Sequence, residues 1–102
     1  MKAKYQLVIQ TVASSIGDYD DMIALEKNIE RQLGDAGIVD GHDMGAGEAN
    51  IFLEVADPRV ALSRIINALS AALPGVKIAY RETGSNDYTP LFPPGLSDFR
   101  VR

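Results

Sequence analysis

The chain has 102 residues, of which 46% are hydrophobic and 24% are charged, and its formal net charge is −4. A chain of this length has room for one hydrophobic core, so we expect a single domain over residues 1–102. It contains no cysteine, which excludes disulfides, thiolate zinc sites and thiol catalysis. Its ten Lys and Arg residues are scattered, so no basic surface for nucleic acid is expected.

Residues 4–13 alternate in polarity, with Tyr5, Leu7 and Ile9 on one side and two glutamines on the other. A two-residue period predicts a half-buried strand. The glutamines also interrupt a stretch already too short for the apolar part of a signal peptide. No apolar run is long enough to span a membrane, so we expect a cytoplasmic protein without membrane contact.

The next segment, residues 18–37, has the spacing of an amphipathic helix. Three early aspartates, Asp18, Asp20 and Asp21, are suited to a helix N-terminus, where they cap free amides and oppose the helix dipole. Gly37 is expected to end the helix. Apolar residues recur every three or four positions and form one stripe: Met22, Leu25, Ile29, Leu33 and Ala36.

Residues 38–44 and 49–56 alternate again and predict a hairpin closed by the tight connection at residues 45–48. Asp57 and Pro58 then form a strong helix start, because Asp can cap amides while Pro at the first helical position loses no needed N–H. We expect this second helix to end at Pro74-Gly75. A last alternating segment, residues 76–81, predicts a fourth strand.

This β-α-β-β-α-β order resembles the ferredoxin-like fold over residues 4–82. The resemblance implies an α+β sandwich, in which a four-stranded antiparallel sheet of order 4-1-3-2 carries both helices on one face. It implies no particular function, because the fold hosts unrelated chemistries. Residues 83–102 form a proline-rich, aromatic tail, which we expect to pack on the sheet or on a partner subunit.

The sheet face without helices is expected to show Val8 and Phe52 among polar side chains. Two such apolar residues need cover, either from the tail or from a second copy of the chain, so a homodimer is one possibility. The full set expected on this face is Gln6, Val8, Gln10, Asn50, Phe52, Glu54, Lys77 and Arg81.

Residues 40–48, DGHDMGAGE, combine the chain's one histidine with three carboxylates and three glycines. The spacing D-G-x-x-x-G-x-G-E resembles a signature of small uncharacterised bacterial proteins, which implies no activity. Gly45 and Gly47 could belong to a phosphate-binding loop, but such loops precede a helix, whereas here a strand and the anionic Glu48 follow. A hairpin turn is the favoured interpretation.

The residue types of this segment are compatible with two kinds of chemistry. Asp40, His42, Asp43 and Glu48 carry ligand atoms for a hard or borderline cation. In a regular strand Asp40 and His42 share a face while Asp43 points the other way, and no second histidine exists. His42 could alternatively act as a base, oriented by Asp40 or Asp43, with Ser14 or the adjacent Ser15 as nucleophile. No spacing demands either chemistry, so we expect no metal, no cofactor and no catalytic residue.

Two other ligand classes follow from the fold. RNA-binding domains of similar architecture stack bases on aromatic residues of the central strands, but here Phe52 stands alone beside Glu54. The architecture is also similar to that of ACT domains, which bind amino acids near a glycine in the first strand-helix turn. Gly17 occupies that turn in this chain.

We therefore expect a non-enzymatic interaction or regulatory module that acts through protein-protein contact. The alternative is a small ligand-binding protein or enzyme at the edge where the first strand-helix turn meets the hairpin. The candidate ligand or partner contacts are Ser14, Asp40, His42, Asp43, Glu48 and Phe52.

Overall fold

The computed structural model describes residues 4–101, which form an α+β fold with two helices and five strands. No helix in this range is long and apolar enough to cross a membrane. The elements are β1 (Tyr5–Val12), α1 (Tyr19–Leu33), β2 (Gly37–Gly45), β3 (Glu48–Val55), α2 (Pro58–Ala72), β4 (Lys77–Glu82) and β5 (Thr89–Phe92), with 3-10 turns η1 (Ala13–Ser15) and η2 (Gly34–Ala36).

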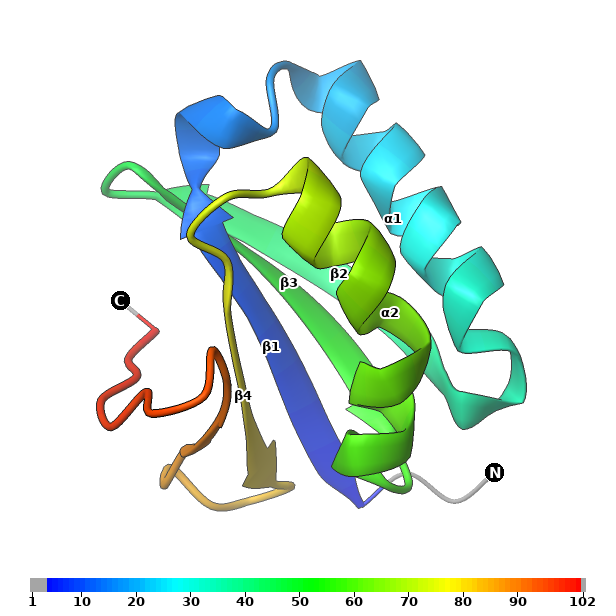
Figure 1. Ribbon diagram of the computed structural model, residues 1–102, viewed down its shortest axis with the longest axis vertical. Helices are drawn as coiled ribbons and strands as arrows, with labels where there is room; N and C mark the ends of the chain where they lie inside the picture. The colour runs from blue at the N-terminus through cyan, green and yellow to red at the C-terminus, as the bar shows by residue number, and fades with distance from the viewer. Residues whose placement is uncertain (1–3, 102) are drawn as a thin grey trace.

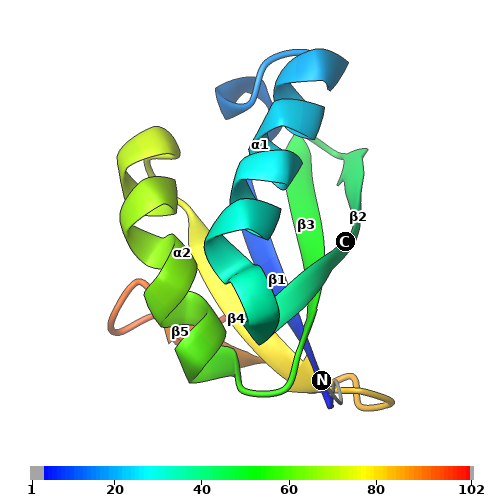
Figure 2. The same cartoon turned by 90° about the vertical axis from the view of Figure 1, so that its right-hand side faces the viewer.

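The strands form one antiparallel sheet in the order β2-β3-β1-β4-β5, and both helices cover the same face (Figures 1 and 2). The ferredoxin-like element order and the predicted neighbours of the first four strands are confirmed. The prediction of a four-stranded sheet is wrong, because β5 pairs with the outer edge of β4.

The core lies between the helices and the face of the sheet that they cover. On the central strands, Leu7, Ile51 and Leu53 are fully or almost fully buried, as the alternating pattern requires. Buried side chains of α1 and α2 complete the core: Met22, Ile29, Leu33, Ala61, Ile65 and Leu69. Burying each large aliphatic side chain contributes about 1.5–3 kcal/mol, so this layer is the main source of stability.

Both helices begin at a capping aspartate. Asp18 accepts a hydrogen bond from the Asp21 backbone N–H, and the Asp21 side chain accepts one from the Asp18 N–H. Asp57 caps α2 in front of Pro58, as expected. The expected end of α1 at Gly37 is wrong: Gly34, with φ 55°, ends the helix, and a 3-10 turn carries the chain into β2.

Pro90 is the reason why β5 escapes prediction. Proline lacks an N–H and argues against a central strand, yet it is tolerated at a sheet edge. Here Pro90 lies opposite Ala79 on the last strand of the sheet. The tail, in which the sequence predicted no strand, therefore extends the sheet by β5.

The rest of the tail folds back over the sheet face opposite the helices (Figure 1). Val8 and Ala79 are completely buried there, and Phe99 is only 8% exposed. The ring of Phe99 lies 5.2 Å from that of Tyr88, measured between centroids. Val8 was expected on this face under cover of either the tail or a second copy of the chain, and in the structure the tail lies over it.

Candidate functional site

A bulge in β2 determines which way the residues around His42 point. Val39 lies opposite Leu53, but Gly41 already lies opposite Phe52, so Asp40 is an extra residue in the strand. His42 consequently lies opposite Ile51, on the helix-covered face. The expectation that Asp40 and His42 share a face assumed a regular strand, and alternation does not run through the bulge.

His42 has a partner that the sequence did not suggest. Its Nδ1 lies 3.0 Å from Oε1 of Glu26 on α1, and the two side chains are only 24% and 13% exposed. No hydrogen bond within residues 4–101 joins His42 to Ser14, Asp40 or Asp43. The Ser-His-Asp arrangement considered from the sequence is therefore not formed.

The signal for Glu26 was present in the helical pattern. It lies four residues after Met22 and three before Ile29, so it occupies the apolar stripe of α1 instead of the outer face. A carboxylate on such a stripe needs a polar partner. Which partner it takes depends on the sheet, because β2 must first place the histidine beside α1.

The remaining candidates of β2 and the first turn are surface residues. Ser14, Asp40 and Asp43 are all exposed. Within residues 4–101, no group of three or more His, Asp or Glu side chains is arranged to hold a metal ion. The aspartates leave the outer strand with an acidic surface.

Gly17 is explained by the start of α1. It has φ 100°, and a Cβ atom at this position would collide with the Asp21 carboxylate that closes the capping box. The glycine is therefore required by the local turn. It no longer supports an ACT-like ligand site in this turn.

The hairpin connection is a turn without a phosphate-binding geometry. Ala46 and Gly47 both have positive φ, 53° and 79°, as a type I′ hairpin turn requires. Gly47 also accepts a hydrogen bond of 2.9 Å from the Ala13 N–H, which brings the hairpin against the end of β1. The expected meeting of these two loops is thus observed.

Glu48, directly after the turn, lies on the face that the tail covers. Its Oε2 atom is buried and accepts no hydrogen bond within residues 4–101. Phe52 shares this face and packs against Val8 and Phe99 as part of the second apolar cluster. Glu48 and Phe52 thus face away from His42, so the sequence candidates divide between the two faces of the sheet.

Gln10 holds the tail in place next to Glu48. Its Nε2 donates to Oδ1 of Asn50 at 3.0 Å and to the carbonyl of Arg100 at 2.6 Å. Gln10 and Asn50 are 7% and 2% exposed, so this is a buried polar network. This network gives a structural role to Gln10 and Asn50, two of the polar residues expected on this face of the sheet. Together they bind the tail segment that covers the face.

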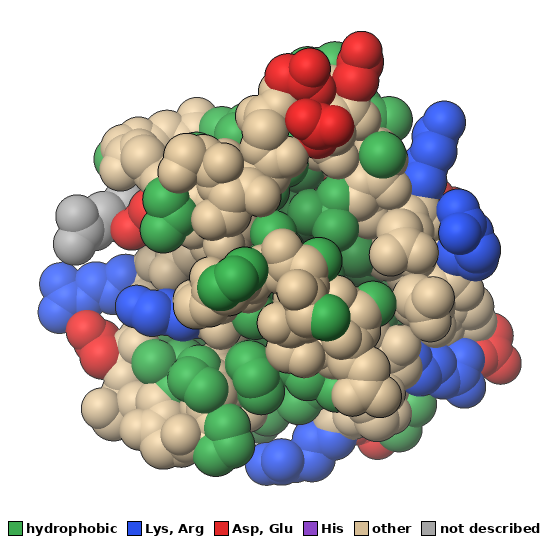
Figure 3. Space-filling model, turned by 45° about the horizontal axis from the view of Figure 1, so that its top comes forward, with side chains coloured by type: hydrophobic (Ala, Val, Ile, Leu, Met, Phe, Trp, Pro, Cys, Tyr) green, Lys and Arg blue, Asp and Glu red, His purple; other side chains and the backbone are tan. Residues whose placement is uncertain are grey.

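Of the five large hydrophobic residues that are exposed within residues 4–101, three lie on or beside β2, while Val12 lies on β1 and Val60 on α2. Ile38 and Met44 lie on β2 and are 51% and 43% exposed. Tyr19, at the start of α1, is 69% exposed, and its ring centroid lies 6.4 Å from that of His42. Figure 3 shows acidic side chains gathered at one end of the molecule, and the start of α1 carries the exposed Asp18, Asp20 and Asp21. The β2 side of the molecule therefore combines apolar and acidic groups.

Comparison of the chain with protein-family models, with curated proteins and with solved structures gave no match. A functional assignment for this chain therefore rests on its own geometry.

Proposed function

We propose that the chain is a non-enzymatic interaction module that binds an extended segment of a partner protein along β2. The observation that carries the proposal is the exposure of Tyr19 and Met44 at the hairpin end of β2, where Tyr19 lies beside His42 and Met44 lies opposite Ala49 on the same, helix-covered side. Ile38 is also exposed, but it lies near the other end of β2, opposite Glu54. On the opposite face of the sheet, the tail buries Val8 and Ala79.

The outer edge of β2 can accept a further strand. Of the two edge strands, β2 has nine residues and pairs only with β3, whereas β5 has four. An extended peptide that adds to a sheet edge gains backbone hydrogen bonds, and neighbouring side chains give it specificity. Here Tyr19 and Met44 would contact the apolar side chains of the added strand.

The acidic side chains around β2 and the bulge in this strand indicate which residues a partner segment should carry and where it should bind. Asp40 and Asp43 are exposed on β2, and the acidic start of α1 lies at the same side, so the partner segment should carry Lys or Arg. The bulge at Asp40 interrupts the regular edge. We therefore place the added strand against residues 41–45.

The alternative of an enzyme that uses Ser14, His42, Asp43 and Glu48 has less support. His42 is paired with Glu26, and Glu48 lies on the other face of the sheet. We assign His42 a positioning role: it fixes β2 to α1 and so keeps the edge in place for a partner.

A random library of displayed twelve-residue peptides would test the proposal. The expected result is enrichment of peptides that combine Lys or Arg with apolar residues. Met44→Asp should abolish their binding, whereas Val60→Asp should not. Val60 is a matched control, because it is also 43% exposed but lies on α2 beside Asp35 and Ala36, at the opposite end of β2 from residues 41–45.

Amide hydrogen exchange gives the second readout, since a bound strand should protect amides of residues 41–45. The proposal is wrong if no peptide is enriched, or if Val60→Asp and Met44→Asp reduce binding equally. It is also wrong if light scattering after size exclusion shows a dimer that Met44→Asp dissociates, because the edge would then bind a second copy of the chain.

A further inference from the structure

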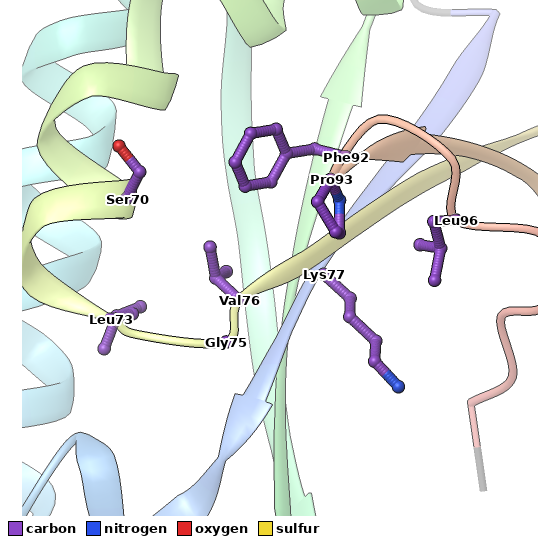
Figure 4. A pocket seen from close by; sticks show the side chains of 8 residues that line it. All are labelled: Ser70, Leu73, Gly75, Val76, Lys77, Phe92, Pro93 and Leu96. Atoms are coloured by element: carbon purple, nitrogen blue, oxygen red, sulfur yellow. The ribbon is translucent and has the colours of Figure 1, made fainter.

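A second surface feature lies at the other side of the molecule, around the start of β4. An open apolar cavity of about 460 Å³ lies between the end of α2 and the turn that follows β5 (Figure 4). Leu73, Val76, Phe92 and Leu96 supply most of its apolar lining. Its volume is in the range of small-molecule pockets.

This cavity exists because β5 stops before it reaches the start of β4. The ladder between the two strands ends at the Ile78–Phe92 pair, so Lys77 has no neighbour on β5. Pro93 follows, lacks an N–H, and turns the chain, with the Leu96 N–H donating to the Pro93 carbonyl at 3.1 Å. The turn stands away from α2 and leaves the space between them open.

A polar cavity adjoins the apolar one. It has a volume of about 310 Å³ and is lined by Gln10, Glu48, Lys77 and the tail residues 98–100. A smaller cavity of about 100 Å³ shares Gln10, Glu48 and Lys77 with it, and shares Gly75 and Lys77 with the apolar cavity. We call the three cavities together the β4 trough.

Lys77 lies where the two halves of the β4 trough meet. Figure 4 shows its side chain pointing away from Val76 and Leu73, toward the side of the sheet on which the tail lies. It forms no ion pair with another residue of the described range 4–101. Its ammonium group is therefore free to bind an anionic group of a ligand.

Glu48 supplies the opposite charge within the same cavities. Its buried Oε2 atom accepts no hydrogen bond from the described residues, and a buried carboxylate oxygen without a donor is costly. A ligand ammonium group would supply the missing donor. Arg100 and Asp98 also border the polar cavity, but they contact each other at 3.7 Å through Nε and Oδ1.

We propose that the β4 trough binds a free α-amino acid with a large apolar side chain. The α-ammonium group donates to Glu48, the α-carboxylate accepts from Lys77, and the side chain enters the apolar cavity beside Phe92 and Leu96. One molecule thereby satisfies a buried acceptor, an unpaired cation and an apolar surface. This site is separate from the β2 edge and does not depend on the proposed peptide binding.

The wall that the tail contributes is held firmly enough to form such a site. Gln10 binds the Arg100 carbonyl at 2.6 Å, and Phe99 is buried with Val8 and Ala79. A ligand therefore meets a surface that is largely formed before binding, which lowers the entropic cost of binding.

Isothermal titration with the full chain would test the site, with L-leucine and L-phenylalanine as probes. We expect a Kd of about 1 mM or tighter for at least one of them. Three related compounds separate the parts of the ligand: leucinamide lacks the carboxylate, 4-methylpentanoate lacks the ammonium group, and glycine lacks the side chain. Each should bind at least roughly tenfold more weakly, since hydrogen bonds to charged groups contribute about 1.5–3 kcal/mol.

Two variants of the protein each remove one of the charges that we propose to bind the ligand. Glu48→Gln and Lys77→Gln should each weaken binding of the preferred amino acid by roughly tenfold or more. Glu82→Gln is the control, because Glu82 is exposed at the far end of β4 and lines none of the three cavities. Thermal unfolding of each variant shows whether it is folded, and Lys77 is exposed, so its replacement should leave the fold intact.

The proposal is overturned if neither amino acid binds the folded chain in the millimolar range. It is also overturned if 4-methylpentanoate or leucinamide binds as well as leucine, or if Lys77→Gln binds leucine like the unaltered chain. The β2 variant Met44→Asp should bind leucine normally, so failure of one proposal can be distinguished from failure of the other.

Discussion

His42 of β2 and Glu26 of α1 form the polar contact between the outer strand and the helix above it. Nδ1 and Oε1 are 3.0 Å apart, and the side chains are 24% and 13% exposed. Burial at this level makes an unmade hydrogen bond costly. The pair therefore holds the edge strand against α1 at the surface to which we assign partner binding.

Removing the carboxylate from this pair should destabilise the fold. We expect Glu26→Ala to lower the free energy of unfolding by about 1–2 kcal/mol, because it leaves the ring nitrogen of His42 without a partner. Glu26→Gln should lower the free energy of unfolding less, since its amide oxygen can still accept a hydrogen bond from His42. Urea unfolding measures both changes.

Glu30→Ala is the control for this change, because Glu30 lies one turn further along α1 and is exposed. Equal losses for Glu26→Ala and Glu30→Ala would show that the contact with His42 contributes no stability of its own.

Gly17 and Gly47 should differ in their tolerance of alanine, although both have positive φ. Alanine in a left-handed conformation costs roughly 1–2 kcal/mol at either position. At Gly17 the added Cβ also meets the Asp21 carboxylate, whereas nothing lies within 4 Å at Gly47. We expect Gly17→Ala to lower the free energy of unfolding by about 1 kcal/mol more than Gly47→Ala, because the Asp21 carboxylate must move and lose the hydrogen bond from the Asp18 N–H.

Thermal unfolding followed by circular dichroism would compare the two alanine variants. If Gly47→Ala were as destabilising as Gly17→Ala, the capping box would not be what requires glycine before α1.

Local signals in the sequence were sufficient for most of the fold. The alternation in residues 4–13 and the spacing of Met22, Ile29 and Leu33 depend only on near neighbours in the chain, and both predicted the right element. The pair Asp57-Pro58 placed the start of α2 at the right residue for the same reason.

The features that escaped prediction depend on contacts between distant segments. β5 forms because the edge of β4 is available to it, and Pro90 within its sequence argues against a strand when the sequence is considered alone. His42 can reach its partner because of a bulge at Asp40, and no local pattern in the sequence predicts this bulge. The β4 trough joins Glu48, Lys77 and Leu96, which come from three different parts of the chain.

Phe99 should contribute more than any other residue of the tail to holding the tail against the sheet. It is 8% exposed and contacts the cluster that contains Val8 and Ala79. Phe99→Ala should lower the free energy of unfolding by about 3 kcal/mol, the low end of the range for buried phenylalanines, because a terminal segment can shift to fill the space. Asp98→Ala, at an exposed neighbour, should change it by less than about 0.5 kcal/mol.

Guanidinium unfolding of the two tail variants gives the comparison. A loss for Phe99→Ala no larger than that for Asp98→Ala would mean that the tail leaves the sheet readily, and the Val8 face would then be available to a partner after all.

The contact between Asp35 and Arg64 should be visible in a pH titration. The Arg64 guanidinium donates a hydrogen bond of 2.7 Å to Asp35, and this bond, together with the positive charge, lowers the pKa of the Asp35 carboxyl below its ordinary value. A lowered pKa means that the ionised carboxylate is favoured in the folded chain. The stability that it contributes is present above the ordinary pKa of about 3.9 and is lost as the pH falls through the folded value.

We expect Arg64→Met to raise the pKa of Asp35 toward its ordinary value, as followed by carbon NMR of the carboxyl group. Arg59→Met, on the same helix, should leave the pKa of Asp35 low. Within residues 4–101, the ion pair of Asp35 is formed with Arg64. An unchanged titration of Asp35 in Arg64→Met would rule out this assignment of the shift.

Variants of Asp35 and Arg64 can separate two contributions to stability: the ion pair between them and the hydrogen bond from Arg64 to the end of α1. Arg64 also donates to the carbonyl of Leu33 at 2.9 Å, where α1 ends and its last carbonyls lack helical partners. Arg64→Met removes both contacts, whereas Asp35→Asn removes only the ion pair, which is exposed and contributes little. At neutral pH we therefore expect Arg64→Met to lower the free energy of unfolding by about 1 kcal/mol more than Asp35→Asn does.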